Sequence, residues 1–139
     1  MLTDAALIAS SALLGGMAFF SFVVAPQVFI RLPPDHAGRL IRALFPWYHG
    51  FGSALAALAM LLALLGAPLV PMLLLVMILV GFLVAGFVLM PMINDARDRG
   101  LDGDGAAQRR FDRLHRASVI LNAVQMLAVL AVLPLLATS

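Results

Sequence analysis

The sequence predicts an all-α integral membrane protein, a four-helix bundle that forms one domain over residues 1–139. Hydrophobic residues make up 63% of the chain and charged residues only 12%, whereas about 25% of a soluble domain is usually charged. The apolar residues gather in four long runs, and a bilayer-spanning helix needs roughly 20 such residues. All nine basic residues are arginines, and they lie in two stretches between these runs.

The four apolar runs contain no Asp, Glu, Lys or Arg. One such residue at mid-membrane would cost about 2.5–3.5 kcal/mol on insertion scales. We expect the first run to be a retained helix and not a cleaved signal peptide, because no basic residue precedes Arg31. The expected transmembrane helices are at about 5–25, 50–67, 69–93 and 117–137.

The arginines predict the orientation of the bundle. The two basic stretches follow the first and third helices, so they lie on one side of the membrane, and positive-inside bias places that side in the cytoplasm. The expected topology is N-out/C-out, with two helical hairpins, each with a basic cytoplasmic loop. This pattern is typical of a multi-pass protein of a bacterial-type inner (plasma) membrane. The two stretches contain Arg31, Arg39 and Arg42, then Arg97, Arg99, Arg109, Arg110, Arg113 and Arg116.

The first basic loop contains an amphipathic segment. Residues 36–45 repeat apolar side chains at helical spacing, and Asp35 is a plausible N-cap. We expect this helix to lie in the headgroup layer, with Arg39 and Arg42 near anionic lipid headgroups. Pro46 is expected to break or kink the path before the second span. Trp47 and Tyr48 follow it at the position of an interfacial aromatic belt.

The second basic loop, residues 94–110, is expected to be a flexible, solvated connector. Its Asp-Gly-Asp-Gly run at 102–105 suggests a calcium loop only faintly, because the chain has no Glu to complete an EF-hand. Cysteine is also absent, which excludes disulfides, thiol redox couples and cysteine-based metal sites. We therefore expect no metal site. No basic arm with interleaved aromatics indicates nucleic acid as a partner.

Polar side chains inside the membrane are the candidate functional residues, because lipid offers them no hydrogen-bond partner. Those on the last helix share an arc about 80° wide, at about 100° per residue. One interpretation is a ligand-binding pocket that opens to the cytoplasm. The other is that these groups bond across helices and stabilise the bundle. The candidate pocket consists of His49, Ser53, Asn94, His115, Ser118, Asn122 and Gln125.

The composition does not favour an enzyme. Without Cys or Glu, and with every Asp except Asp4 in or beside a basic loop, no nucleophile–base–acid set is visible. We expect the pocket to bind or pass a small ligand or a proton, or the protein to act as a membrane partner protein, without a cofactor. The alternative is a redox protein that holds b-type haem between His49 and His115. A third interpretation is passive permeation through a homo-oligomer.

Several short motifs resemble one known family, the transmembrane protein 205-like family, over essentially the whole chain. This resemblance implies a small four-helix membrane domain without an assigned activity. The short loops and the absence of Cys depart from the family pattern and argue against capture of a soft metal by a thiol. The motifs are Pro26 through Phe29 with Leu32, Ala37-Gly38, Pro46-x-Tyr48, Pro91-x-Ile93-Asn94-x-x-Arg97-Asp98, and Phe111-x-x-Leu114-His115-x-x-Ser118-x-x-x-Asn122.

Overall fold

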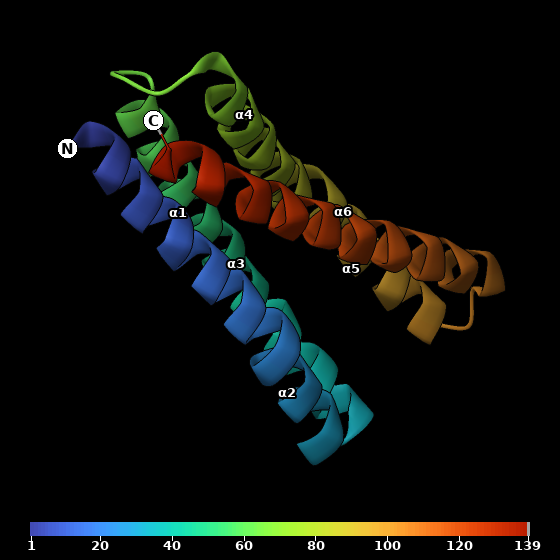
Figure 1. The fold of residues 1–139 in the computed structure, drawn as a ribbon. Helices are drawn as coiled ribbons and strands as arrows, with labels where there is room; N and C mark the ends of the chain where they lie inside the picture. The colour runs from blue at the N-terminus through green and yellow to red at the C-terminus, as the bar shows by residue number, and fades with distance from the viewer. Residues whose placement is uncertain (139) are drawn as a thin grey trace.

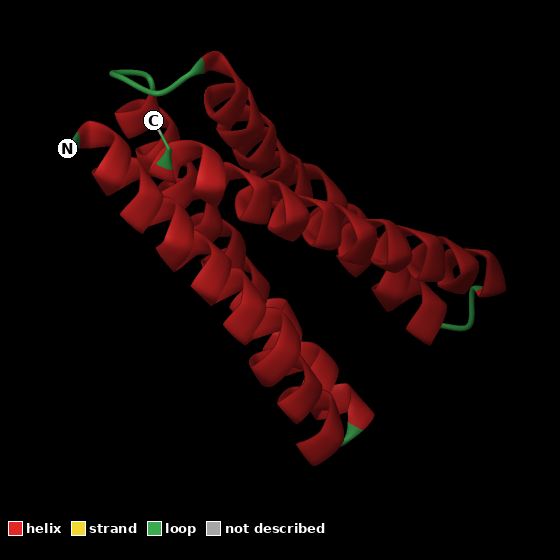
Figure 2. Ribbon diagram, viewed as in Figure 1, coloured by secondary structure: helices red, strands yellow, loops and turns green. Residues whose placement is uncertain are grey.

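Two antiparallel helical hairpins make up the structure, a computed structural model that describes residues 1–138 (Figure 1). Every regular element in that range is helical (Figure 2). In each hairpin, a helix with one π-helical turn leads through a short connection into a single long helix. The first hairpin comprises α1 (Leu2–Phe19), η1 (Phe20–Val24), α2 (Ala25–Arg31) and α3 (Pro34–Ala63), and the second comprises α4 (Leu69–Val84), η2 (Ala85–Leu89), α5 (Met90–Leu101) and α6 (Gly105–Ala137).

Three helical units are long and apolar enough to cross a membrane: Leu2–Arg31, Leu69–Leu101 and Gly105–Ala137. They make the chain a multi-pass membrane protein and confirm the all-helical fold class. The span expected at 50–67 lies mostly in α3, which is not one of the three. Only the C-terminal half of α3 is strongly apolar, because its first half carries charged and polar aromatic residues.

Each π-helical turn lies just before a proline. η1 ends two residues before Pro26, and η2 ends two residues before Pro91. Proline has no N–H to donate to the carbonyl four residues earlier. A turn with wider hydrogen bonding lets the helix continue past this gap, and such π-bulges are common near functional sites. The two hairpins therefore have the same local structure, a π-helical turn followed by a proline, at corresponding places.

The buried core lies toward the end of the bundle where both termini and residues 64–68 come together (Figure 1). Small side chains on α1 and α3 are buried there and permit close helix packing, which is the usual basis of helix association in lipid. Among the described residues, no member of the core cluster lies on α2 or α5. The two hairpins therefore join at this end and diverge toward Leu32–Pro33 and residues 102–104 (Figure 1). The core contains Ala6, Ala9, Leu13, Met17, Ala56, Ala59, Ala63, Leu75, Ile78, Phe82, Ala128, Val129, Val132 and Leu136.

Two interruptions expected from the sequence are not seen. The segment 36–45 does not form a separate helix, because α3 continues through Pro46 into the second half. One missing backbone hydrogen bond does not end a helix that packs against a neighbour along its length. The second basic loop is also much shorter than the expected 94–110, because α5 extends to Leu101 and α6 begins at Gly105.

A side-chain cap marks where α6 begins. The Asp104 carboxylate accepts hydrogen bonds from the backbone N–H groups of Ala106 (2.9 Å) and Ala107 (3.1 Å), which caps α6. The bonds from Ala107 and Ala106 hold the pKa of this carboxyl below its ordinary value. Asp35, in contrast, is not the cap of α3. That helix begins at Pro34 and has Asp35 in its first turn, without a capping side chain.

Candidate functional site

The wedge between the diverging hairpins contains two cavities of similar size. The first, about 320 Å³, lies between α3 and the second hairpin, along α4, η2 and the start of α5. The second, about 340 Å³, lies between the η1–α2 segment and α6, with α3 as one wall. Phe45, His49 and Met90 line both cavities and separate one from the other. Volumes of this size are at the lower end of the range for small-molecule sites.

The seven predicted pocket residues are distributed between these cavities. Ser53 and Asn94 line the first cavity only, while the four residues of the α6 stripe line the second only. His49 belongs to both. The α6 stripe lines the second cavity along its length, from the exposed His115 to the buried Gln125, and consists of His115, Ser118, Asn122 and Gln125.

A polar network connects three elements at the inner end of the second cavity. The Tyr48 hydroxyl of α3 donates to Asn122 Oδ1 of α6, and Asn122 Nδ2 donates to the hydroxyl of Ser21 in η1 at 3.0 Å. Both bonds join the first hairpin to the second. Because one amide group serves as acceptor and donor at once, Asn122 holds the two hairpins together where they begin to separate.

Tyr48, which was expected in the interfacial aromatic belt, lines the second cavity. Ile41, Phe45 and Tyr48 share one face of α3 and line the second cavity. Their spacing of four and three residues was the available clue. Trp47, the other residue assigned to the belt, points away from the wedge and is 80% exposed.

His49 is the most unusual side chain in the wedge. Its ring stacks on Phe45 at 5.7 Å between ring centroids and meets Tyr48 and Phe82 edge-on. Both ring nitrogens are buried, and neither has a hydrogen-bond partner. A neutral imidazole offers one donor and one acceptor, so two hydrogen-bonding positions are open in an aromatic enclosure.

The remaining stripe residues also have partners in the protein. Gln125 is buried and donates from Nε2 to the Ile78 carbonyl of α4 at 3.0 Å, so it also joins helices. Ser118 donates to the His115 carbonyl one turn earlier. The His115 ring is exposed and stacks on Phe111, with 5.7 Å between ring centroids and 9° between the planes. His115 and Ser118 therefore form the outer part of the cavity.

Arginines surround the open end of the wedge. Arg42 of α3 forms an ion pair with Asp98 of α5 through Nη1, at 2.8 Å to Oδ1 and 3.0 Å to Oδ2. Arg42, which we expected at lipid headgroups, thus also connects the hairpins. Arg39 is exposed. Within residues 1–138, no group of three or more His or Asp side chains gathers to hold a metal ion.

Comparison with known proteins identifies one family. The model of a family described as a domain of unknown function (DUF4149) matches residues 8–102, which include both π-helical turns and every lining residue of the first cavity. Curated proteins give no match, and neither do solved structures. The family match covers more than half of the chain. The chain therefore belongs to the DUF4149 family, a domain of unknown function.

Proposed function

We propose that this protein is a four-span membrane protein whose wedge binds a small ligand from the cytoplasmic side. α3 runs beside the α1–α2 segment (Figure 1), so a membrane crossed by one is crossed by the other. All nine arginines lie toward the end where the hairpins diverge, which supports an N-out/C-out topology in a bacterial-type inner membrane. The likeness to the transmembrane protein 205-like family remains part of this proposal and rests on the sequence motifs given above.

The observation that carries the proposal is the unpartnered imidazole of His49. In a membrane interior, each buried polar group without a hydrogen-bond partner costs several kcal/mol. This is about the free energy needed to move such a group from water into an apolar medium. Such groups are therefore rare, and each one calls for an explanation. A ligand in the wedge would supply the missing donor and acceptor, and the Phe45, Tyr48 and Phe82 rings would enclose its apolar part.

Closure of the wedge at its other end supports binding over passage through the protein. Leu13 and Met17 of α1, together with Val129 and Val132 of α6, are almost fully buried in the core beyond the cavities. A proton or solute that enters from the diverging end meets this packed layer. Transport would therefore require the two hairpins to rearrange.

A pair of matched substitutions on α6 tests this function. Val119 lines the second cavity, and Val124 lies on the same helix outside both cavities; the two are 54% and 49% exposed. We expect native mass spectrometry of the protein purified in mild detergent to detect a bound small molecule, which Val119→Trp removes and Val124→Trp retains. Equal occupancy in both variants, or no bound molecule in the unmodified protein, contradicts the proposal.

Haem b is the second candidate ligand, because His49 and His115 line the same cavity and both His49 ring nitrogens lack partners. If this ligand is correct, protein expressed with haem available has a Soret band that His49→Ala and His115→Ala both alter. His36, which lines neither cavity, is the matched control position. A Soret band that none of these substitutions changes, or no band at all, rules out this candidate.

A further inference from the structure

Arg97 is the arginine that the described structure leaves without a partner inside the wedge. It lies on α5 and is half-buried. The neighbouring arginines Arg42 and Arg99 pair with Asp98 and Asp95, but Arg97 has no hydrogen bond or ion pair with any residue in the range 1–138. A guanidinium has five N–H donors and is always charged, so this one has unmet hydrogen-bonding capacity in a partly desolvated place.

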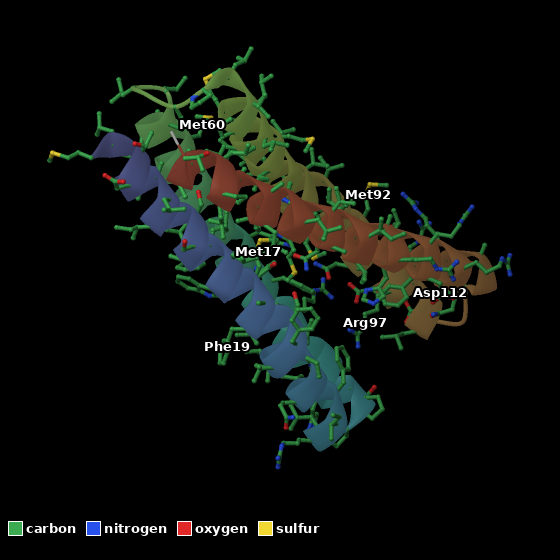
Figure 3. The ribbon with its side chains drawn as sticks, viewed as in Figure 1. Met17, Phe19, Met60, Met92, Arg97 and Asp112 are labelled. Carbon is green, nitrogen blue, oxygen red and sulfur yellow. The ribbon has the colours of Figure 1, made fainter. Side chains whose placement is uncertain are left out.

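A glycine on the opposite hairpin makes room for this guanidinium. Arg97 reaches from α5 across the wedge to Gly38, a buried residue of α3 (Figure 3). A Cβ at position 38 would overlap the guanidinium group, so only glycine accommodates the side chain in this position. The absence of a side chain at Gly38 thus permits the positive charge to lie against α3, and a Cβ there would displace it.

The charge lies directly beyond the two cavities. Ile41, one turn after Gly38 on α3, lines the second cavity. On α5, Met90 lines both cavities and lies seven residues before Arg97, on the same helical face. The second cavity is lined by the aromatic side chains of Phe29 and Phe45, among others, so a molecule that extends from the guanidinium into it would contact apolar surface.

We propose that the wedge binds an anionic phospholipid, with its phosphate on the Arg97 guanidinium and an acyl chain in the second cavity. The assignment rests on the function proposed above and names the occupant. The ester carbonyls and headgroup hydroxyls of a phospholipid such as phosphatidylglycerol are the groups that would pair with the His49 ring, which lines the second cavity. Arginine forms two parallel hydrogen bonds to a phosphate, which makes this pair strong and directional. The cytoplasmic leaflet presents such headgroups to basic segments, and the apolar part of the second cavity, which includes Phe29, Ile41 and Phe45, suits a hydrocarbon chain.

Titration of lipids into delipidated full-length protein, followed by native mass spectrometry, tests the assignment. The probes are phosphatidylglycerol, diacylglycerol with the same chains, and inorganic phosphate. We expect phosphatidylglycerol to bind at least about tenfold more tightly than diacylglycerol, since charge-assisted hydrogen bonds contribute on this scale. Inorganic phosphate should not displace it. Equal binding of the two lipids overturns the phosphate contact, and displacement by inorganic phosphate overturns the lipid source.

Two substitutions perturb the Arg97 guanidinium in different ways. Arg97→Gln removes the charge, while Gly38→Ala keeps the arginine but displaces it. Each should weaken phosphatidylglycerol binding by about tenfold or more, with unchanged helical circular dichroism. Arg99→Gln, which alters an exposed arginine paired with Asp95, should leave binding unchanged. So should Gly15→Ala, because Gly15 lines neither cavity and its new Cβ meets open space.

These outcomes separate the lipid assignment from the proposed function. Wild-type affinity in both Arg97→Gln and Gly38→Ala overturns the phospholipid assignment. If Val119→Trp still removes another small molecule in that case, the wedge remains a ligand site of a different class. If Val119→Trp displaces nothing, the proposed function itself fails.

Discussion

Replacing Asn122 by alanine should loosen the junction between the two hairpins. The substitution removes two hydrogen bonds that cross between hairpins, to Tyr48 and to Ser21. Interhelical bonds in membranes contribute about 0.6 kcal/mol each on average. The Tyr48 hydroxyl, left without its partner, adds about 1 kcal/mol. We therefore expect the free energy of unfolding to fall by about 2 kcal/mol, the sum of these terms.

Reversible unfolding in mixed micelles with an increasing fraction of a denaturing detergent measures this change. Asn94→Ala is the matched control, because Asn94 lines the first cavity without a hydrogen bond in the described structure. A double-mutant cycle with Tyr48→Phe should give a coupling of about 1.6 kcal/mol, because Tyr48→Phe removes both the shared bond and the hydroxyl that Asn122→Ala leaves unpaired. A coupling near zero, together with equal losses in Asn122→Ala and Asn94→Ala, would refute the reasoning.

Two further substitutions test the packing of the hairpins and the cap of α6. Gly52→Ala should destabilise the protein by about 1–3 kcal/mol, because the new Cβ would overlap the buried ring of Phe82. Gly50→Ala should not destabilise it, because a Cβ at position 50 meets open space. Equal unfolding midpoints for the two variants would contradict the predicted overlap. Asp104→Ala should increase amide hydrogen exchange in the first turn of α6, whereas Asp102→Ala should not. The pKa of Asp104 is lowered in the folded state, so its cap is at full strength above the ordinary carboxyl pKa and is lost as pH falls through the lowered value. The protection of these amides, after correction for intrinsic exchange, should therefore fall in this acid range. Constant protection there would contradict the assignment of Asp104 as the cap of α6.

The helical content was predictable because each apolar run needs internal hydrogen bonds in lipid. The ends of the helices were less predictable. Charged and polar residues at 94–101 suggested a loop, yet arginine is a good helix former, and α5 continues to Leu101. Pro46 suggested a break, but packing of α3 against the first helix outweighs one lost hydrogen bond. In both places the tertiary contacts decide the outcome.

The candidate site was partly predictable for a similar reason. Helical spacing placed Asn122 and Gln125 on an inward face of α6, and both are inward. The division of the predicted pocket into two cavities depends on how far the hairpins diverge, and no local pattern reports that angle. Arg97 was visible only as one basic loop residue, because the place of its guanidinium depends on Gly38, which lies 59 positions earlier in the sequence.

Nitrogen NMR of the histidine rings tests the central claim that the wedge is a ligand site most directly. The chain has three histidines, so the ring signals of His49 are readily assigned with single substitutions. We predict that the His49 ring nitrogens shift between the ligand-stripped and ligand-bound protein, as their open hydrogen-bonding positions are filled, while those of His36 do not. Identical His49 signals in the two samples would contradict the account.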